Sequence, residues 1–299
     1  MNYTHPRGFA SLALALSLFG TACSKDEGGT PSPEAGADVA ADVGASDASV
    51  SCDLDAPFGA ATLVDFRPSL DAGSIPLSGV LRVDAKDERF GAFDAVQGPA
   101  TKIFVALRSG GSFVSADERV ASTTVVHSSP ALFGDGKDLL FVAPSAGKNA
   151  IFRAPADAKD LTEAAPWLTD AADLAMPYVA SDDAVYAVRG GAAIRVPVTA
   201  KKAGTPTAVD GVPANVNGVV VDASETVLYY GRGSSFADAE LHEMRKSGST
   251  WTEKGAVTIG GLQKPETPSW LSADGCRLYV RGWPSPIDRV LYVAEKPKK

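Results

Sequence analysis

Short apolar runs and polar turns alternate along most of this chain. The clearest example is PSWLSADGCRLYV, residues 268–280, in which two apolar runs enclose the acidic turn Asp274-Gly275. A short apolar run bounded by turn residues predicts a β-strand, and Asp-Gly favours the tight turn of a hairpin. Weaker copies occur upstream, with turns at Asp87-Glu88, Asp135-Gly136, Asp182-Asp183 and Ser224-Glu225.

Two series of apolar positions repeat with a period in the forties. The strand after each turn aligns at positions spaced 48, 46, 43 and 50 residues apart: Ala92, Leu140, Tyr186, Tyr229 and Tyr279. A further strand aligns at positions spaced 48, 43, 47 and 50 residues apart: Ile103, Ile151, Ile194, Leu241 and Leu291. A period in the forties built from short strands is typical of a β-propeller, with one four-stranded blade per repeat. An ordinary β-sandwich with turns at similar intervals is the alternative.

The predicted fold class is therefore all-β, a five-bladed β-propeller formed by residues 52–299. The last repeat has no outer strand of its own, whereas residues 52–64, CDLDAPFGAATLV, have the character of one. We expect this N-terminal strand to dock on the last blade and close the ring, which would cover an exposed sheet edge. A six-bladed propeller is the alternative, if residues 66–76 form a degenerate blade.

The first 22 residues are predicted to be a signal peptide. His5 and Arg7 precede an apolar run at residues 9–19, which is shorter than the roughly 20 residues that a transmembrane helix needs. Small residues then precede Cys23, and this arrangement resembles a bacterial lipobox, in which the cysteine is acylated. Gly20 stands where that motif usually has Leu. A plain signal peptide with an incidental cysteine is the alternative.

Residues 23–51 are predicted to be the lipidated cysteine followed by a disordered tether. The segment consists mostly of Ala, Asp, Gly, Ser and Pro, so it cannot bury enough apolar surface to offset its ordering entropy. Ser24 follows the cysteine, and by resemblance to lipoprotein sorting rules this favours the outer membrane over the inner one. We therefore expect an exported lipoprotein that contacts the membrane through its lipid anchor only.

Two further cysteines, Cys52 and Cys276, suggest a disulfide bond in an exported protein. The bond would join the two ends of the propeller, and the chain-entropy model gives it roughly 4–5 kcal/mol. Two unpaired buried thiols are the alternative.

The sequence offers little catalytic chemistry. His127 and His242 are scattered, so we expect them at the surface or at a strand edge, and we predict no catalytic, cofactor-binding or metal-binding residue and no cofactor. The formal net charge is −8 and no basic stripe occurs, which disfavours nucleic-acid binding. Paired carboxylates near the propeller channel are the remaining enzymatic option, and the candidates are Asp84, Asp182, Asp222 and Glu266.

The phrase at residues 268–280 resembles the TolB-type (WD40-like) β-propeller repeat. The matching residues are Pro268, Leu271, Ser272, Asp274, Gly275, Leu278, Tyr279 and Val280. The resemblance covers most of residues 52–299 and implies the fold. Propellers of this kind include envelope scaffolds, peptidase gating domains and carbohydrate-active enzymes, so the function must be argued from the site.

The expected function is a binding or scaffolding module of the cell envelope. The lipid anchor, the tether and the lack of a convergent catalytic set favour this role over enzyme activity. The expected partner is an unidentified envelope protein or glycan, and the expected state is a monomer. The alternative is a carbohydrate-active hydrolase or lyase that uses carboxylates at the propeller channel.

Overall fold

The computed structural model describes residues 52–64, 82–83, 90–97, 100–109, 112–119, 127–133, 136–285 and 288–299. The predicted signal peptide, Cys23 and tether lie outside the described residues, and so do residues 66–76 and Asp84. Every element in the described part of the chain is a β-strand. Within these ranges no helix is long and apolar enough to cross a membrane.

Four sheets of four strands and one sheet of five strands make up most of the fold, and neighbouring strands within each are antiparallel. One sheet consists of β3 (Arg82–Val83), β4 (Phe90–Gln97), β5 (Ala100–Ser109) and β6 (Ser112–Arg119). The next consists of β7 (Ser128–Phe133), β8 (Asp138–Ser145), β9 (Lys148–Pro155) and β10 (Ala165–Leu168). The five-stranded sheet consists of β11 (Leu174–Ser181), β12 (Ala184–Arg189), β13 (Ala192–Thr199), β14 (Lys202–Ala203) and β15 (Thr207–Ala208).

The remaining sheets bring distant parts of the chain together. One consists of β16 (Val216–Val221), β17 (Val227–Arg232), β18 (Glu240–Ser247) and β19 (Thr250–Ala256). Another consists of β21 (Lys264–Leu271), β22 (Arg277–Ser285), β23 (Asp288–Glu295) and β2 (Thr62–Leu63). A short parallel pair is formed by β1 (Phe58–Ala60) and β20 (Ile259–Gly260).

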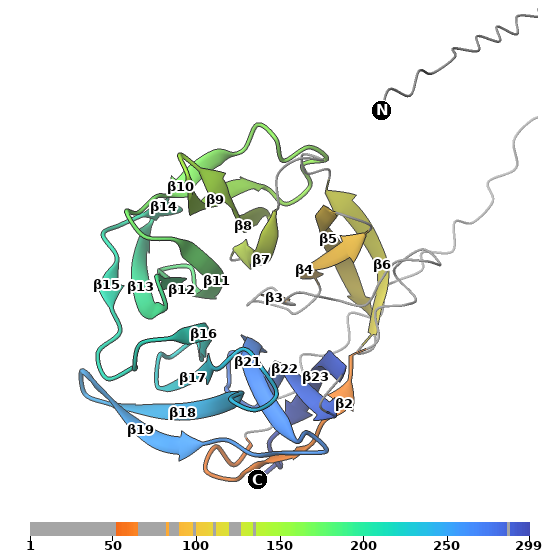
Figure 1. Cartoon of the computed structure of the whole chain (residues 1–299), viewed down its shortest axis with the longest axis vertical. Helices are drawn as coiled ribbons and strands as arrows, with labels where there is room; N and C mark the ends of the chain where they lie inside the picture. The colour runs from red at the N-terminus through yellow and green to blue at the C-terminus, as the bar shows by residue number, and fades with distance from the viewer. Residues whose placement is uncertain are drawn as a thin grey trace, which may run out of the picture. The chain divides into compact units, whose positions relative to one another are not determined.

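The sheets are arranged around a common centre, with β3, β7, β11, β16 and β21 nearest to it (Figure 1). In each sheet the following strands then lie progressively farther out. The described chain is thus an all-β propeller, as the sequence period predicts.

Both predicted register series are confirmed. The first series lies on the second strand of each sheet, and its five side chains are at most 2% exposed. The second series lies on the third strand of each sheet, and its side chains are at most 3% exposed. The apolar period arises because each repeat must bury the same two strands between neighbouring sheets.

Contacts between sheets hold the arrangement together. The hydroxyl group of Tyr178 on β11 donates hydrogen bonds to the carbonyl oxygens of Val221, 2.8 Å away, and Leu271, 3.0 Å away, so one side chain joins three sheets. Gly231 on β17 lies so close to β21 that a Cβ atom there would be 2.0 Å from the carbonyl oxygen of Glu266. Only glycine fits such a close backbone approach.

Residues 52–64, which we call the N-terminal segment, contact the last part of the chain. β2 pairs with β23 in the outer position of its sheet. Cys52 forms a β-bridge with Lys298 and a disulfide bond with Cys276, with the two Cα atoms 5.8 Å apart.

Candidate functional site

The predicted candidate carboxylates that the structure describes do not meet at one place. Asp182 is exposed in the turn between β11 and β12. Asp222 follows the last residue of β16, and its Oδ1 atom accepts hydrogen bonds from the backbone N–H groups of Thr226, at 2.7 Å, and Val227, at 2.6 Å. Glu266 lies near the beginning of β21. Asp222 is therefore the centre of a turn, and the glycosidase arrangement of two facing carboxylates is not formed by these three residues.

Glu266 is fully buried and has structural partners. Its Oε2 atom accepts a hydrogen bond of 2.9 Å from the indole N–H group of Trp283. Its Oε1 atom lies 3.3 Å from the hydroxyl group of Thr267 and 3.9 Å from the guanidinium group of Arg281. Ion pairing and hydrogen bonding offset the cost of burying this carboxylate.

The innermost strands contact one another through small and apolar side chains. The hydroxyl group of Ser129 on β7 lies 3.4 Å from the sulfur atom of Met176 on β11. A Cβ atom at Gly218 on β16 would lie 3.3 Å from the Met176 methyl group and 2.9 Å from the methyl group of Thr267 on β21. Near the beginnings of β7, β11, β16 and β21, therefore, side chains of neighbouring sheets are in contact.

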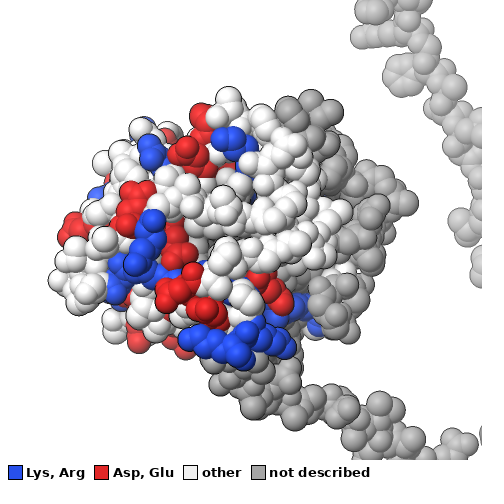
Figure 2. Space-filling model, turned by 90° about the horizontal axis from the view of Figure 1, so that it is seen from below, with Lys and Arg blue, Asp and Glu red and all other residues white. Residues whose placement is uncertain are grey.

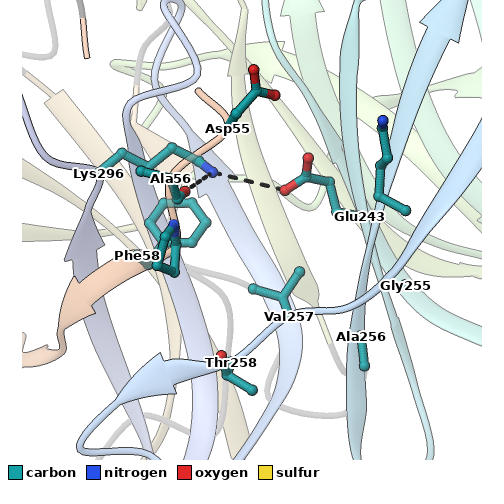
Figure 3. Close-up of a pocket in the computed structure, with 11 residues that line it drawn as sticks. Asp55, Ala56, Phe58, Glu243, Gly255, Ala256, Val257, Thr258 and Lys296 are labelled. Carbon is teal, nitrogen blue, oxygen red and sulfur yellow. Dashed lines mark hydrogen bonds and ion pairs between the residues drawn. The ribbon is translucent and has the colours of Figure 1, made fainter. Parts of the chain in front are cut away.

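One cavity, of about 350 Å³, lies beside the N-terminal segment, and we call it the Lys296 cavity (Figure 3). The ammonium group of Lys296 donates hydrogen bonds of 2.8 Å to the carbonyl oxygens of Leu54 and Ala56. It also lies 3.8 Å from the Glu243 carboxylate and 4.6 Å from the centre of the Phe58 ring. Through these contacts Lys296 holds the N-terminal segment in place.

A second cavity, of about 570 Å³, lies where β16, β17 and the loop at residues 233–239 meet, and we call it the Arg232 cavity. Its lining includes Asn217, Arg232, Asp238 and Glu240. The volume falls within the range of about 300–1,000 Å³ that is usual for small-molecule sites. Most of its lining residues are polar, although polar and apolar groups contribute about equally to its surface.

Several oxygen atoms in the Arg232 cavity have no protein partner. The side-chain amide of Asn217 donates to the carbonyl oxygen of Gly233 at 2.6 Å, while its buried Oδ1 atom accepts no hydrogen bond. Asp238 uses its Oδ1 atom to accept from the backbone N–H groups of Ser234 and Ser235, at 3.2 Å and 2.8 Å. Its Oδ2 atom accepts none from the residues that the structure describes. The Asn217 Oδ1 atom is enclosed by protein, since a Cβ atom at Gly231 would lie 2.3 Å from it, whereas the Asp238 side chain is exposed to solvent.

Hydrogen bonds also determine the charge of this lining. The Asp238 carboxylate accepts hydrogen bonds from the hydroxyl and backbone N–H groups of Ser235 and from the backbone of Ser234. These hydrogen bonds hold the pKa of Asp238 below its ordinary value. The carboxylate of Asp238 is therefore ionised at neutral pH. The cavity lining thus contains two carboxylates, Asp238 and Glu240, which accept hydrogen bonds, and the guanidinium group of Arg232, which donates them.

Glu240 is attached to a group of polar side chains on β17, β18 and β19. Its Oε2 atom lies 3.1 Å from Nε2 of His242, whose Nδ1 atom lies 2.7 Å from Oε1 of Glu253. The Tyr230 ring stacks on the His242 ring with centroids 5.0 Å apart, and the Tyr230 hydroxyl group donates to Glu253 at 3.1 Å. Burial, together with the charge of Glu253, raises the pKa of Tyr230 to about 12, so its hydroxyl group keeps its proton as a donor.

The two histidines were expected at the surface or at a strand edge, and the surface position is wrong for both. His242 is 8% exposed because the carboxylates and Tyr230 surround it. His127 is 4% exposed and lies against the ring of Phe141, with centroids 5.4 Å apart. Glu240 and His242 are two residues apart on one strand, so their side chains lie on the same face of it. This spacing was the sequence signal that could have predicted their contact. No group of three His, Cys, Asp or Glu residues that could hold a metal ion occurs among the described residues.

Charged side chains of both signs lie next to one another on the face drawn in Figure 2. Ion pairs between neighbouring strands and sheets agree with this mixing. Arg195 binds Glu225 at 2.8 Å, and Arg153 binds Asp138 at 2.8 Å.

No protein-family model matches this chain, and no curated protein is significantly similar to it in sequence. Solved structures do resemble it. TolB from Acinetobacter baumannii has a TM-score of 0.50 and 12% identity, and the match covers 75% of this chain and 55% of that protein. A luciferin-regenerating enzyme has a TM-score of 0.48 and 10% identity, covering 79% of this chain and 97% of that one.

TolB from Agrobacterium tumefaciens has a TM-score of 0.47 and 10% identity, and the match covers 70% of this chain and 72% of that one. Sequence identities this low are evidence of a shared fold and not of a shared activity. Of these three, the Acinetobacter protein alone reaches a TM-score of 0.50, and it agrees with the repeat seen in the sequence and with the sheets seen in the structure. The fold of this chain is therefore that of a TolB-like β-propeller.

Proposed function

We propose that this chain is an exported, lipid-anchored binding or scaffolding module of the cell envelope. Residues 1–22 are the signal peptide, Cys23 carries the lipid, and residues 24–51 hold the propeller of residues 52–299 away from the outer membrane. The protein acts as a monomer, touches the membrane through its lipid only, and binds an envelope protein or glycan but no nucleic acid.

We further propose that the propeller has five blades and is closed by the N-terminal segment. In support, the first strands contact one another in a cyclic order, β3 to β7, β7 to β11, β11 to β16, β16 to β21, and β21 back to β3. The outer position beside β23 is occupied by β2 from the N-terminal segment. Such pairing removes an exposed edge from the last blade.

The observation that carries the binding function is the Arg232 cavity itself, a hollow of about 570 Å³ whose lining combines the guanidinium group of Arg232 with the exposed carboxylates of Asp238 and Glu240. Its volume falls within the range that is usual for ligand sites. The carboxylate-based hydrolase or lyase receives no comparable support, since Asp222 is hydrogen-bonded within its own turn and Glu266 is buried against Trp283 and Arg281.

Co-sedimentation with washed cell envelopes tests this function. The chain from residue 23 onward, with Cys23→Ser to remove the lipid, should sediment with envelopes from the organism that makes it. Glu240→Ala and Arg232→Ala should each weaken binding about tenfold, as expected when a charged hydrogen-bond partner is lost.

The matched control is Glu163→Ala, because Glu163 is also exposed and lies far along the chain from the cavity. This variant should bind like the parent protein, and all variants should have the same thermal midpoint. Binding that is equal in all of them, or no binding at all, would contradict the proposed function.

A further inference from the structure

We infer that His242 is a pH-dependent switch that decides whether Glu240 pairs with the histidine ring or with Arg232. Each of the two ring nitrogens faces a carboxylate. Nδ1 lies 2.7 Å from Oε1 of Glu253, and Nε2 lies 3.1 Å from Oε2 of Glu240. This switch goes beyond the proposed binding function and does not depend on it.

Both contacts of His242 can be hydrogen bonds only when the ring carries a proton on each nitrogen. An ionised carboxylate accepts hydrogen bonds and donates none, and a neutral imidazole has one N–H group. The cationic ring therefore satisfies both carboxylates, whereas the neutral ring turns a nitrogen lone pair toward one of them. Because His242 is 8% exposed, the ring is largely shielded from water, and the two facing acceptors repel each other.

Glu240 is the partner that leaves when the ring loses a proton. Glu253 makes the shorter contact, and it also accepts a hydrogen bond of 3.1 Å from the Tyr230 hydroxyl group. The Tyr230 ring stacks on the imidazole with an interplanar angle of 11°, which fixes the orientation of the ring. The Glu240 side chain is 51% exposed, and among the described residues the histidine is the partner of its carboxylate. The neutral ring thus keeps its proton on Nδ1 for Glu253 and releases Glu240.

Arg232 is a second cation within reach of Glu240. The two residues are directly opposite in the antiparallel pairing of β17 with β18, and the Cβ atoms of such pairs lie about 4.5–5.5 Å apart on one face of a sheet. While Glu240 is bound to His242, the described structure contains no ion pair between Glu240 and Arg232. Histidine is the side chain whose charge ordinarily changes between about pH 5 and 8. Across this range the Arg232 guanidinium group, which lines the Arg232 cavity, therefore passes from unpaired with Glu240 to paired with it.

The charged and titratable side chains closest to the ring belong to its own sheet. They are Tyr230 and Arg232 on β17, Glu240 on β18 and Glu253 on β19. β21, with Lys264 and Glu266, lies against the opposite face of this sheet, since a Cβ atom at Gly231 would point at the Glu266 backbone. The connection before β16 reaches the His242 face at Met244 and carries Asp210, which is exposed to solvent.

Nitrogen NMR of isotope-labelled histidine and arginine side chains tests the switch. The chain from residue 23 onward, with Cys23→Ser, has two histidines, and whichever of His127→Gln and His242→Gln folds assigns their signals. As the pH rises from about 5 to 8, the His242 ring should change from two protonated nitrogens to one, with the proton on Nδ1. The Arg232 Nε–H signal, assigned with Arg232→Gln, should shift with the same midpoint.

Glu240→Gln separates the switch from a direct effect of the histidine charge on Arg232. Without the Glu240 charge the His242 titration should move to lower pH, because a nearby opposite charge favours the cationic ring. The Arg232 signal should then no longer follow the histidine. The matched control is Glu163→Gln, which replaces another exposed carboxylate and should leave both titrations unchanged.

Three results would overturn the switch. The first is a His242 ring that keeps the same number of protons throughout this pH range. The second is an Arg232 signal that stays constant while the ring titrates, and the third is an Arg232 signal that still follows the ring in Glu240→Gln. Because no envelope or ligand is present in these measurements, the binding function can fail while the switch stands, and the switch can fail while the binding function stands.

Discussion

At the scale of single residues, charged side chains connect sheets that are neighbours in the propeller. Asp138 on β8 accepts a hydrogen bond of 2.8 Å from Arg153 on β9 and binds the ammonium group of Lys201, which lies in the turn between β13 and β14. The carbonyl oxygen of Lys201 also accepts a hydrogen bond of 2.9 Å from the indole N–H group of Trp167. One carboxylate thus joins the sheet of β7–β10 to the next one.

The Asp138 ion pairs predict a pH-dependent stability. Burial raises the pKa of this carboxyl group, but hydrogen bonds from Lys201 and Arg153 outweigh the effect of burial and hold the pKa below its ordinary value. The stabilisation is therefore fully present above the unfolded pKa of about 4 and is lost as the pH falls through the lower folded value. Asp138→Asn should reduce the free energy of unfolding by about 1–3 kcal/mol at pH 7.

Urea unfolding at pH 7 and at pH 3 measures this effect. The difference between the parent protein and Asp138→Asn should shrink at the lower pH. Asp210→Asn is the matched control, since Asp210 is exposed, and it should change stability little at either pH. A difference of the same size at both values would show that Asp138 does not act through its charge.

At the scale of elements, the N-terminal segment is held by three kinds of contact. β2 pairs with β23, Cys52 is bonded to Cys276, and the Lys296 ammonium group binds two carbonyl oxygens of the segment. The Lys296 side chain is 2% exposed, and burial lowers its pKa. The segment is therefore bound through its backbone as well as its side chains.

Removing the disulfide bond should destabilise the propeller. The bond spans 224 residues, and the chain-entropy model gives roughly 4–5 kcal/mol for a loop of this length. The double variant Cys52→Ser, Cys276→Ser should unfold at a lower urea concentration than the parent protein. Deletion of residues 52–64 should lower the urea midpoint further, because β2 is lost as well.

Intact mass measured with and without reductant gives an independent check, since the parent protein should gain two hydrogens on reduction and the double variant should gain none. An unchanged unfolding midpoint after the deletion would refute the proposed closure by this segment.

At the scale of the whole molecule, the predicted anchor and the cavity belong to different parts of the chain. Residues 23–51 carry six acidic residues against one lysine and few large apolar residues, which is typical of a solvated tether. The propeller then displays the Arg232 cavity at the loop between β17 and β18.

Metabolic labelling with a fatty acid tests the anchor. The full-length chain should become labelled and should fractionate with outer membranes, because the proposed acylated residue is Cys23. Cys23→Ala should lose both properties, whereas Cys52→Ala, the matched cysteine control, should stay labelled. Label that survives Cys23→Ala would exclude the lipobox interpretation.

The sequence by itself determined the repeat, and with it the all-β propeller. This was possible because each repeat buries the same two strands, so the apolar pattern recurs at Tyr186, Tyr229 and Tyr279 with a readable period. The pairing of Cys52 with Cys276 could also be predicted, because these are the two cysteines within residues 52–299. The repeat follows from the local apolar pattern and the disulfide bond from the number of cysteines, and neither prediction requires knowledge of the packing.

Only the tertiary structure decided which polar residues meet. Asn217, Arg232 and Glu240 lie on three strands and Asp238 lies in a loop, and nothing in their spacing along the sequence predicts that they line one cavity. Likewise, the sequence makes Asp222 a candidate catalytic acid, whereas the structure shows that its carboxylate is hydrogen-bonded within its own turn. Strand register and the packing of neighbouring sheets determine whether a carboxylate is satisfied by its own turn or left open to a ligand, and the one-dimensional pattern does not contain that information.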